Sequence, residues 1–110
     1  MAFNLPYFPL YPADFLSDMR VALMTNEQVG CYIKLLCYQW REGSIPQKGE
    51  DISRLLGIDS QAYARLMPGL LECFEGGIQP RLNQEREKAI KHHELLSKSG
   101  QKRWKTKKLH

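Results

Sequence analysis

The sequence predicts a mainly α-helical fold: a winged helix-turn-helix-like domain with at most a small β-hairpin. An amphipathic helix pattern, a helix–glycine–helix pattern and a double-glycine turn support this class. The length of 110 residues is typical of a single domain with one modest core. We expect a domain over residues 1–97, with an extended arm (1–20), a helical core (25–82) and a polar helix (83–97), followed by a basic flexible tail (98–110).

The first 20 residues predict an extended arm that lies across the core. Three prolines fall within positions 6–12, and proline fixes its own φ and disfavours helix at the residue before it. Asp14 is placed to cap one short helical turn near Ser17. The aromatic residues of the arm carry too much apolar surface to remain in water, and we expect them to form an apolar clasp: Tyr7, Phe8, Tyr11 and Phe15.

A long amphipathic helix is predicted over residues 26–42. Thr25 and Gln28 form a capping-box pattern at its start, and Gly43 is placed to end it. Gly30 is interpreted as allowing close helix approach. Apolar residues recur at the spacing of one helical face: Val29, Tyr32, Ile33, Leu36, Cys37 and Trp40.

A helix-turn-helix pattern follows. A short helix around Glu50–Leu56 ends at Gly57, and Asp59 or Ser60 caps a second helix. Pro68 is expected to open a further turn, because proline is tolerated at the first helical position. The long preceding helix and two short elements complete the winged layout: a bridge at Ile45 and a hairpin within Phe74–Leu82 that turns at Gly76 and Gly77.

The last predicted element is a polar helix capped by Asn83 and ending near Ser97. Its apolar stripe is thin, with Leu82, Ala89 and Leu96 at a spacing of seven. We expect the sequence from Ser97 to Gly100 to break it, leaving a mobile basic tail.

Charge is distributed unevenly along the chain. Its net charge is +4, but residues 1–80 hold six Lys/Arg and nine Asp/Glu, whereas residues 81–110 hold ten and three. The pI near 9.1 is therefore a property of the C-terminal quarter and not of the predicted core.

Residues that would indicate catalysis, a cofactor or a metal do not form a recognisable set. His92, His93 and Glu94 are adjacent, so on a helix they point about 100° apart and do not chelate one ion. Three cysteines without a framework pattern indicate reduced thiols in a cytoplasmic protein. The longest apolar run, Val21–Met24, is far too short for a membrane span. We therefore expect no enzyme, no cofactor and no membrane association.

Two features predict nucleic-acid binding. The candidate reading helix exposes Gln61 and Arg65, although three acidic residues lie nearby in sequence, and the alternative is plain scaffold. The tail carries six cations in eleven residues with one aromatic among them, which suits phosphates and an unpaired base. Its alternative is a solubilising tail or a linker. The candidate residues of the tail are Lys98, Lys102, Arg103, Trp104, Lys105, Lys107 and Lys108.

Four motifs in order resemble the YdaU-like family of phages and prophages, whose members often stand at the N-terminus of replication or replisome-organiser proteins. The resemblance covers about residues 5–90. It implies a small winged-helix-like domain in phage DNA replication, acting on DNA or on the host helicase machinery, and it supplies no catalytic residue. The motifs are PYFPLYPADFLSD (6–18), LMTNEQVGCYIKLL (23–36), QWREGSIP (39–46) and LLG (55–57).

Two functions are compatible with these observations. The first is a replication-associated module that binds DNA mainly through the basic tail. The second is a protein-interaction or oligomerisation module that recruits a host helicase or its loader without reading DNA. The mild acidity of residues 1–80 favours the second, and an apolar patch exposed by the aromatic arm would support it.

Overall fold

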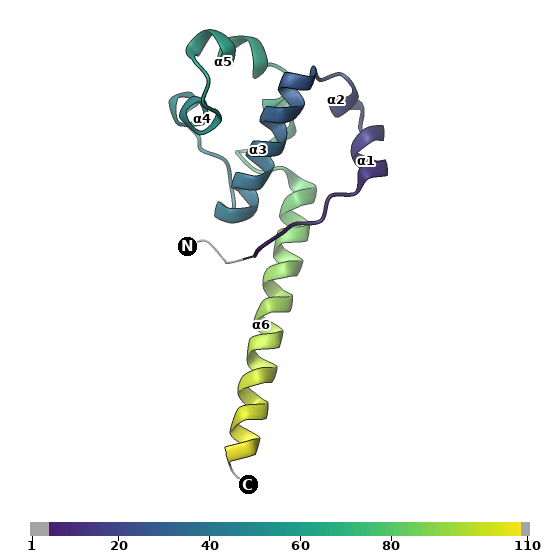
Figure 1. The fold of residues 1–110 in the computed structure, drawn as a ribbon, viewed down its shortest axis with the longest axis vertical. Coiled ribbons are helices and arrows are strands. Elements are labelled where there is room, and N and C mark those ends of the chain that lie inside the picture. Colours follow the sequence, from purple (N-terminus) through teal and green to yellow (C-terminus); the bar gives the residue numbers. More distant parts are fainter. Residues whose placement is uncertain (1–4, 109–110) are drawn as a thin grey trace.

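The computed structural model describes the backbone of residues 5–108 and the side chains of residues 5–97. It is mainly helical, as predicted, and residues 5–108 contain no β-strand. The molecule is elongated, 66 Å by 31 Å by 20 Å, because its last helix projects from a bundle of short ones (Figure 1). The elements are α1 (Pro12–Ser17), α2 (Met19–Ala22), α3 (Asn26–Glu42), α4 (Gly49–Leu56), α5 (Ser60–Leu66), the 3₁₀ turn η1 (Leu71–Cys73) and α6 (Pro80–Lys108).

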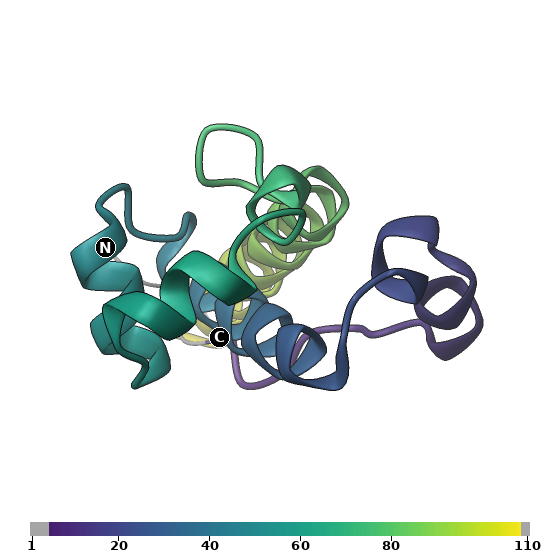
Figure 2. The same cartoon turned by 90° about the horizontal axis from the view of Figure 1, so that it is seen from above.

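Helix α3 is the centre of the fold and matches its prediction. The Thr25 hydroxyl accepts from the Gln28 N–H at 3.2 Å, and the Gln28 side chain accepts from the Thr25 N–H at 2.9 Å. Gly43 ends the helix at φ 99°. Figure 2 shows α1 and α2 on one side of α3 and α4 and α5 on the other. The buried apolar residues around it are Val21, Tyr32, Leu35, Leu36, Trp40, Ile45, Ile52, Leu56, Leu66, Met67, Leu70, Cys73, Phe74 and Leu82.

The helix-turn-helix pattern gives two helices joined by a tight turn. Gly57 adopts φ 68°, and the Asp59 carboxylate accepts from the Ala62 N–H at 2.8 Å, which confirms the predicted stop and cap. The expected hairpin is reduced to one bridge between Glu75 and Ile78. Only a two-glycine turn separates these residues. Because η1 ends two residues before Glu75 and α6 begins two residues after Ile78, a β-ladder longer than this one bridge does not form.

The N-terminal arm is shorter than predicted. Extended backbone ends at Tyr11, and α1 begins at Pro12 because proline is favourable at the first helical position. The Asp18 carboxylate then caps α2 by accepting from the Arg20 N–H at 2.8 Å. The expected arm over residues 1–20 is therefore wrong beyond residue 11, and residues 1–4 lie outside the described part.

Helix α6 differs from its prediction at both ends. It begins at Pro80, and Gln79 caps it by accepting from the Leu82 N–H at 2.6 Å, so Asn83 is not the cap. The expected break from Ser97 to Gly100 is absent, and the helix continues to Lys108. A single glycine costs a helix only about 1 kcal/mol, which does not stop a good helix-forming sequence.

Polar contacts attach the first turns of α6 to α3. The fully buried Gln39 side chain donates to the Gln79 carbonyl at 3.0 Å and accepts from the Gln79 N–H at 2.7 Å. Two turns further on, the Arg86 guanidinium donates to the Trp40 carbonyl at 2.7 Å, where a cation suits the C-terminus of α3. These contacts fix the direction in which α6 leaves the core.

Candidate functional site

Helix α5 presents the first predicted contact residues. Gln61 and Arg65 are both exposed, one helical turn apart. The two terminal guanidinium nitrogens of Arg65, Nη1 and Nη2, each donate to the carboxylate of Glu27 on α3 at 3.2 Å, and that carboxylate raises the pKa of Arg65. With Asp59 at its N-terminus as well, α5 offers a phosphate little free positive charge.

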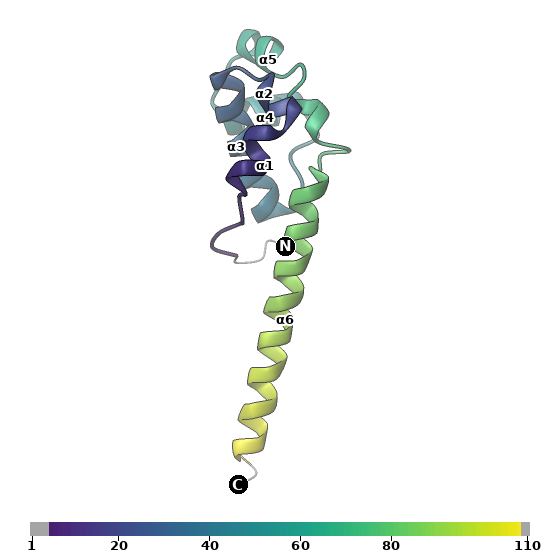
Figure 3. The same ribbon diagram turned by 90° about the vertical axis from the view of Figure 1, so that its right-hand side faces the viewer.

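The second predicted set lies on the distal part of α6. Residues 91–97 are all exposed, and the helix axis continues past them into solvent without a neighbouring element (Figure 3). The 29 residues of α6 span about 43 Å at 1.5 Å per residue. The side chains of the predicted contact residues lie outside the described ones: Lys98, Lys102, Arg103, Trp104, Lys105, Lys107 and Lys108.

The two predicted sets do not form one surface. Helix α5 lies at one end of the long axis of the molecule, and the C-terminal end of α6 lies at the other (Figure 1). A ligand that contacts the basic residues of α6 therefore does not reach Gln61 and Arg65 on the same molecule unless it spans most of that axis.

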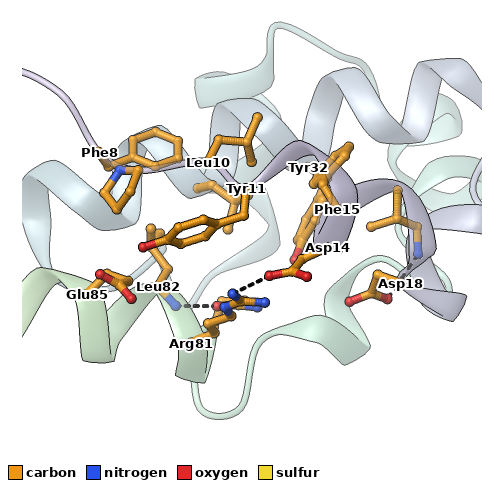
Figure 4. Close-up of a pocket in the computed structure, with 14 residues that line it drawn as sticks. Phe8, Leu10, Tyr11, Asp14, Phe15, Asp18, Tyr32, Arg81, Leu82 and Glu85 are labelled. Carbon is orange, nitrogen blue, oxygen red and sulfur yellow. Dashed lines mark hydrogen bonds and ion pairs between the residues drawn. The ribbon is translucent and has the colours of Figure 1, made fainter.

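A cleft that the sequence did not predict lies between the arm, α1, α3 and α6 (Figure 4). It is small, with a cavity volume of about 80 Å³. Phe8 of the arm and Phe15 of α1 pack on the core beside the cleft: the Phe8 ring centre lies 5.7 Å from that of Trp40, and the Phe15 ring centre lies 6.3 Å from that of Tyr32. The predicted clasp is thus formed by Phe8 and Phe15, whereas Tyr7 and Tyr11 are exposed.

The polar lining of the cleft is acidic overall. Three carboxylates line it, from Asp14, Asp18 and Glu85, against the single guanidinium of Arg81. That guanidinium lies 2.6 Å from the Asp14 carboxylate and 5.0 Å from the centre of the Tyr11 ring. The cleft therefore already holds one cation by an ion pair and an aromatic face. Because Glu85 is paired with Lys88 at 3.8 Å, the negative charge that remains at the cleft is that of Asp18.

Burial affects the phenol at the base of this cleft. Tyr32 is only 4 % exposed, and its desolvation raises its pKa to about 12, with Cys73 and Asp18 adding to the effect. The phenol is therefore neutral near pH 7. It contributes an aromatic wall and a hydroxyl, and no charge.

Large apolar side chains are exposed around the cleft. We call this set the N-terminal apolar surface, and it extends from the arm over α1 and α2. Leu16 lies in α1, Met19 in α2 and Leu23 at the end of α2, and extended backbone at Asp18 separates the two helices. No helical spacing in the sequence therefore marks these residues as one surface. Exposures range from 44 % to 82 % among its members: Tyr7, Leu10, Tyr11, Leu16, Met19 and Leu23.

Comparison with protein-family models, curated proteins and solved structures finds no match to this chain. Within residues 5–108, none of the helices is both long and apolar enough to cross a membrane. The same part of the chain brings no three His, Cys, Asp or Glu residues together as metal ligands.

Proposed function

We propose that this chain is a non-catalytic DNA-binding module whose affinity comes from the basic segment of α6, residues 98–108. One observation carries the proposal: six Lys/Arg and no Asp/Glu occur within these eleven residues, on a helix that projects away from the core. An α-helix fits the major groove, and lysine and arginine neutralise the phosphates on its edges.

The acidic surroundings of α5 support this assignment of the affinity to α6. Arg65 is paired with Glu27, so a phosphate would have to displace a carboxylate to reach it. In the proposed winged-helix-like arrangement, α4 and α5 are the helix-turn-helix, and they serve as the scaffold that presents α6. The resemblance of residues 5–90 to the YdaU-like family supports a role for such a module in phage or prophage DNA replication.

The test is a titration of labelled duplex and single-stranded DNA at two salt concentrations. If the segment contacts four to six phosphates, log K falls against log salt with a slope of about −3.5 to −5.5. A fourfold rise in salt then weakens duplex binding by about 130-fold to 2,000-fold.

The decisive variant replaces all six Lys/Arg of residues 98–108 with glutamine, which keeps helix propensity. We expect it to lose most of its DNA affinity and its salt dependence. The matched control, Arg65→Gln with Gln61→Ala, should bind like the unaltered chain. Equal binding by the six-glutamine variant, or loss of binding in the control, contradicts the proposal.

A second candidate function is protein interaction, such as recruitment of a helicase or its loader. The N-terminal apolar surface favours it, because six large apolar side chains are exposed there within 17 residues of sequence, and exposed apolar surface often marks a partner site. Capture of purified replicative helicase by the immobilised chain tests this alternative. Retention that Leu16→Gln with Met19→Gln abolishes supports it, and no retention contradicts it.

A further inference from the structure

Exposed apolar side chains gather in two places. Among the residues whose side chains are described, every large hydrophobic residue with high exposure lies on the N-terminal apolar surface or at Leu95 and Leu96 of α6. Leu95 is 63 % exposed and Leu96 is 59 % exposed. Two unpartnered apolar surfaces on one chain are each a candidate partner for the other.

The two surfaces also carry opposite charge. The cleft beside the N-terminal apolar surface has three carboxylates and one guanidinium. Immediately after Leu95 and Leu96 come the six cations of residues 98–108. A basic helix with two exposed leucines at its start thus faces a surface that is apolar and carries negative charge, so the two are complementary in both respects.

The two surfaces do not meet within one molecule. Helix α6 is continuous from Pro80 to Lys108, so its distal half leads away from the cleft that its own Arg81 and Leu82 line (Figures 3 and 4). Folding back would require breaking the helix between these parts. A second copy of the chain has no such restriction.

We propose that two copies pair by reciprocal exchange, the distal half of α6 (residues 95–108) of each lying across the mouth of the cleft and on the N-terminal apolar surface of the other. The arrangement is a closed two-fold dimer, because each copy offers one helix and one cleft. Within residues 5–97, this dimer covers every large hydrophobic side chain that is well exposed in the single chain. The DNA-binding segment is engaged in the dimer, so duplex DNA competes with pairing.

Sedimentation equilibrium of the full chain, without nucleic acid and across a wide concentration range, tests the pairing. We expect a monomer–dimer equilibrium at low salt that weakens as salt screens the charge complementarity. Excess duplex DNA should shift the chain toward a monomer–DNA complex. A chain that stays monomeric at every concentration and salt overturns the proposal.

Two variants distinguish reciprocal exchange from other dimers. The surface variant carries Leu16→Gln, Met19→Gln and Leu23→Gln, and the helix variant carries Leu95→Gln and Leu96→Gln. These side chains are exposed, so both variants should fold like the unaltered chain. Each variant alone should associate at least about tenfold more weakly, because both of its helix–cleft contacts are impaired.

An equimolar mixture of the two variants gives the sharpest result. A heterodimer then contains one intact helix facing one intact cleft, so the mixture should associate more strongly than either variant alone. The exposed α3 substitution Lys34→Gln is the control and should leave association unchanged. No gain on mixing, or unaltered association of either variant alone, contradicts reciprocal exchange.

The outcome is separate from that of the DNA-binding proposal. Both variants keep all six cations of residues 98–108, so their DNA affinity in dilute solution tests only the proposed function. The six-glutamine variant should lose both DNA binding and pairing. DNA binding without any self-association leaves the proposed function intact and removes only the dimer.

Discussion

The two halves of α6 have the same backbone conformation and opposite surroundings. The attached half is held by the buried Gln39 pair with Gln79, by Leu82 in the core and by the Arg86 bond to the Trp40 carbonyl. Further along the helix, residues 91–97, which lead into the distal half, are exposed. One helix thus serves two purposes, because its first three turns stabilise the fold while the remainder is available to a partner.

The largest expected effect comes from breaking the attached half. Gln39→Leu removes the acceptor of the Gln79 N–H, which then remains desolvated and unpaired, and one of the two donors to the Gln79 carbonyl, which keeps its bond from the Asn83 N–H at 3.1 Å. We expect a loss of about 3 kcal/mol in the free energy of unfolding, measured by urea denaturation. Gln84→Ala, at an exposed position on the same helix, should change it by less than about 0.5 kcal/mol. Similar costs at both positions contradict the described role of Gln39.

Alkaline pH should weaken the core that supports the attached half. The folded Tyr32 phenol has its pKa raised to about 12, whereas in the unfolded chain it ionises near the ordinary value of 10. The contribution of the neutral phenol to the free energy of unfolding is fully present below pH 10. It is lost as pH rises from 10 toward 12, at about 1.4 kcal/mol per pH unit. The unaltered chain should therefore show a steeper loss over this range than Tyr32→Phe. Identical slopes contradict the desolvation of this phenol.

A smaller effect, of opposite sign, is expected at Gly30. It was interpreted as a close-approach glycine, but it is exposed, and a Cβ there would meet nothing within 4 Å. Gly30→Ala should therefore raise the melting temperature, with a gain of about 0.5–1 kcal/mol. Destabilisation would show that this face of α3 is packed against something in solution.

The smallest effect on stability is expected in the distal half. Replacing the six Lys/Arg of residues 98–108 with glutamine should change the monomer's free energy of unfolding by less than about 0.5 kcal/mol, since the residues before them contact no core. Urea denaturation at high salt and low concentration isolates this monomer value. A marked loss would place the segment within the folding unit.

Local signals predicted α3, α4 and α5 well because the residues that decide their ends are adjacent in sequence. The capping box at Thr25 and the left-handed glycine at Gly57 need no knowledge of the tertiary structure. The start of α6 was misplaced because glutamine is an uncommon cap and Asn83 a common one. Gln79 acts there because the distant Gln39 already holds its backbone, which no local pattern reveals.

The functional surfaces were predicted only in part, for a similar reason. The basic segment is contiguous and was readable as a charge run. The cleft is formed by Asp14 and Arg81, which are 67 residues apart, so no spacing rule brings them together. Likewise, Arg65 was a candidate contact until folding placed Glu27 beside it. Contacts between residues that are far apart in the sequence were therefore the part that the sequence alone did not reveal.

The Arg86 bond to the end of α3 fixes α6 near its start, and most of the helix projects beyond this attachment. About 39 Å of helix separate Leu82 from Lys108. A tilt of about ten degrees at the anchor moves the far end by roughly 7 Å. A tilt of this kind changes the Arg86 bond to the Trp40 carbonyl and the Arg81 ion pair with Asp14, because both lie near the start of α6.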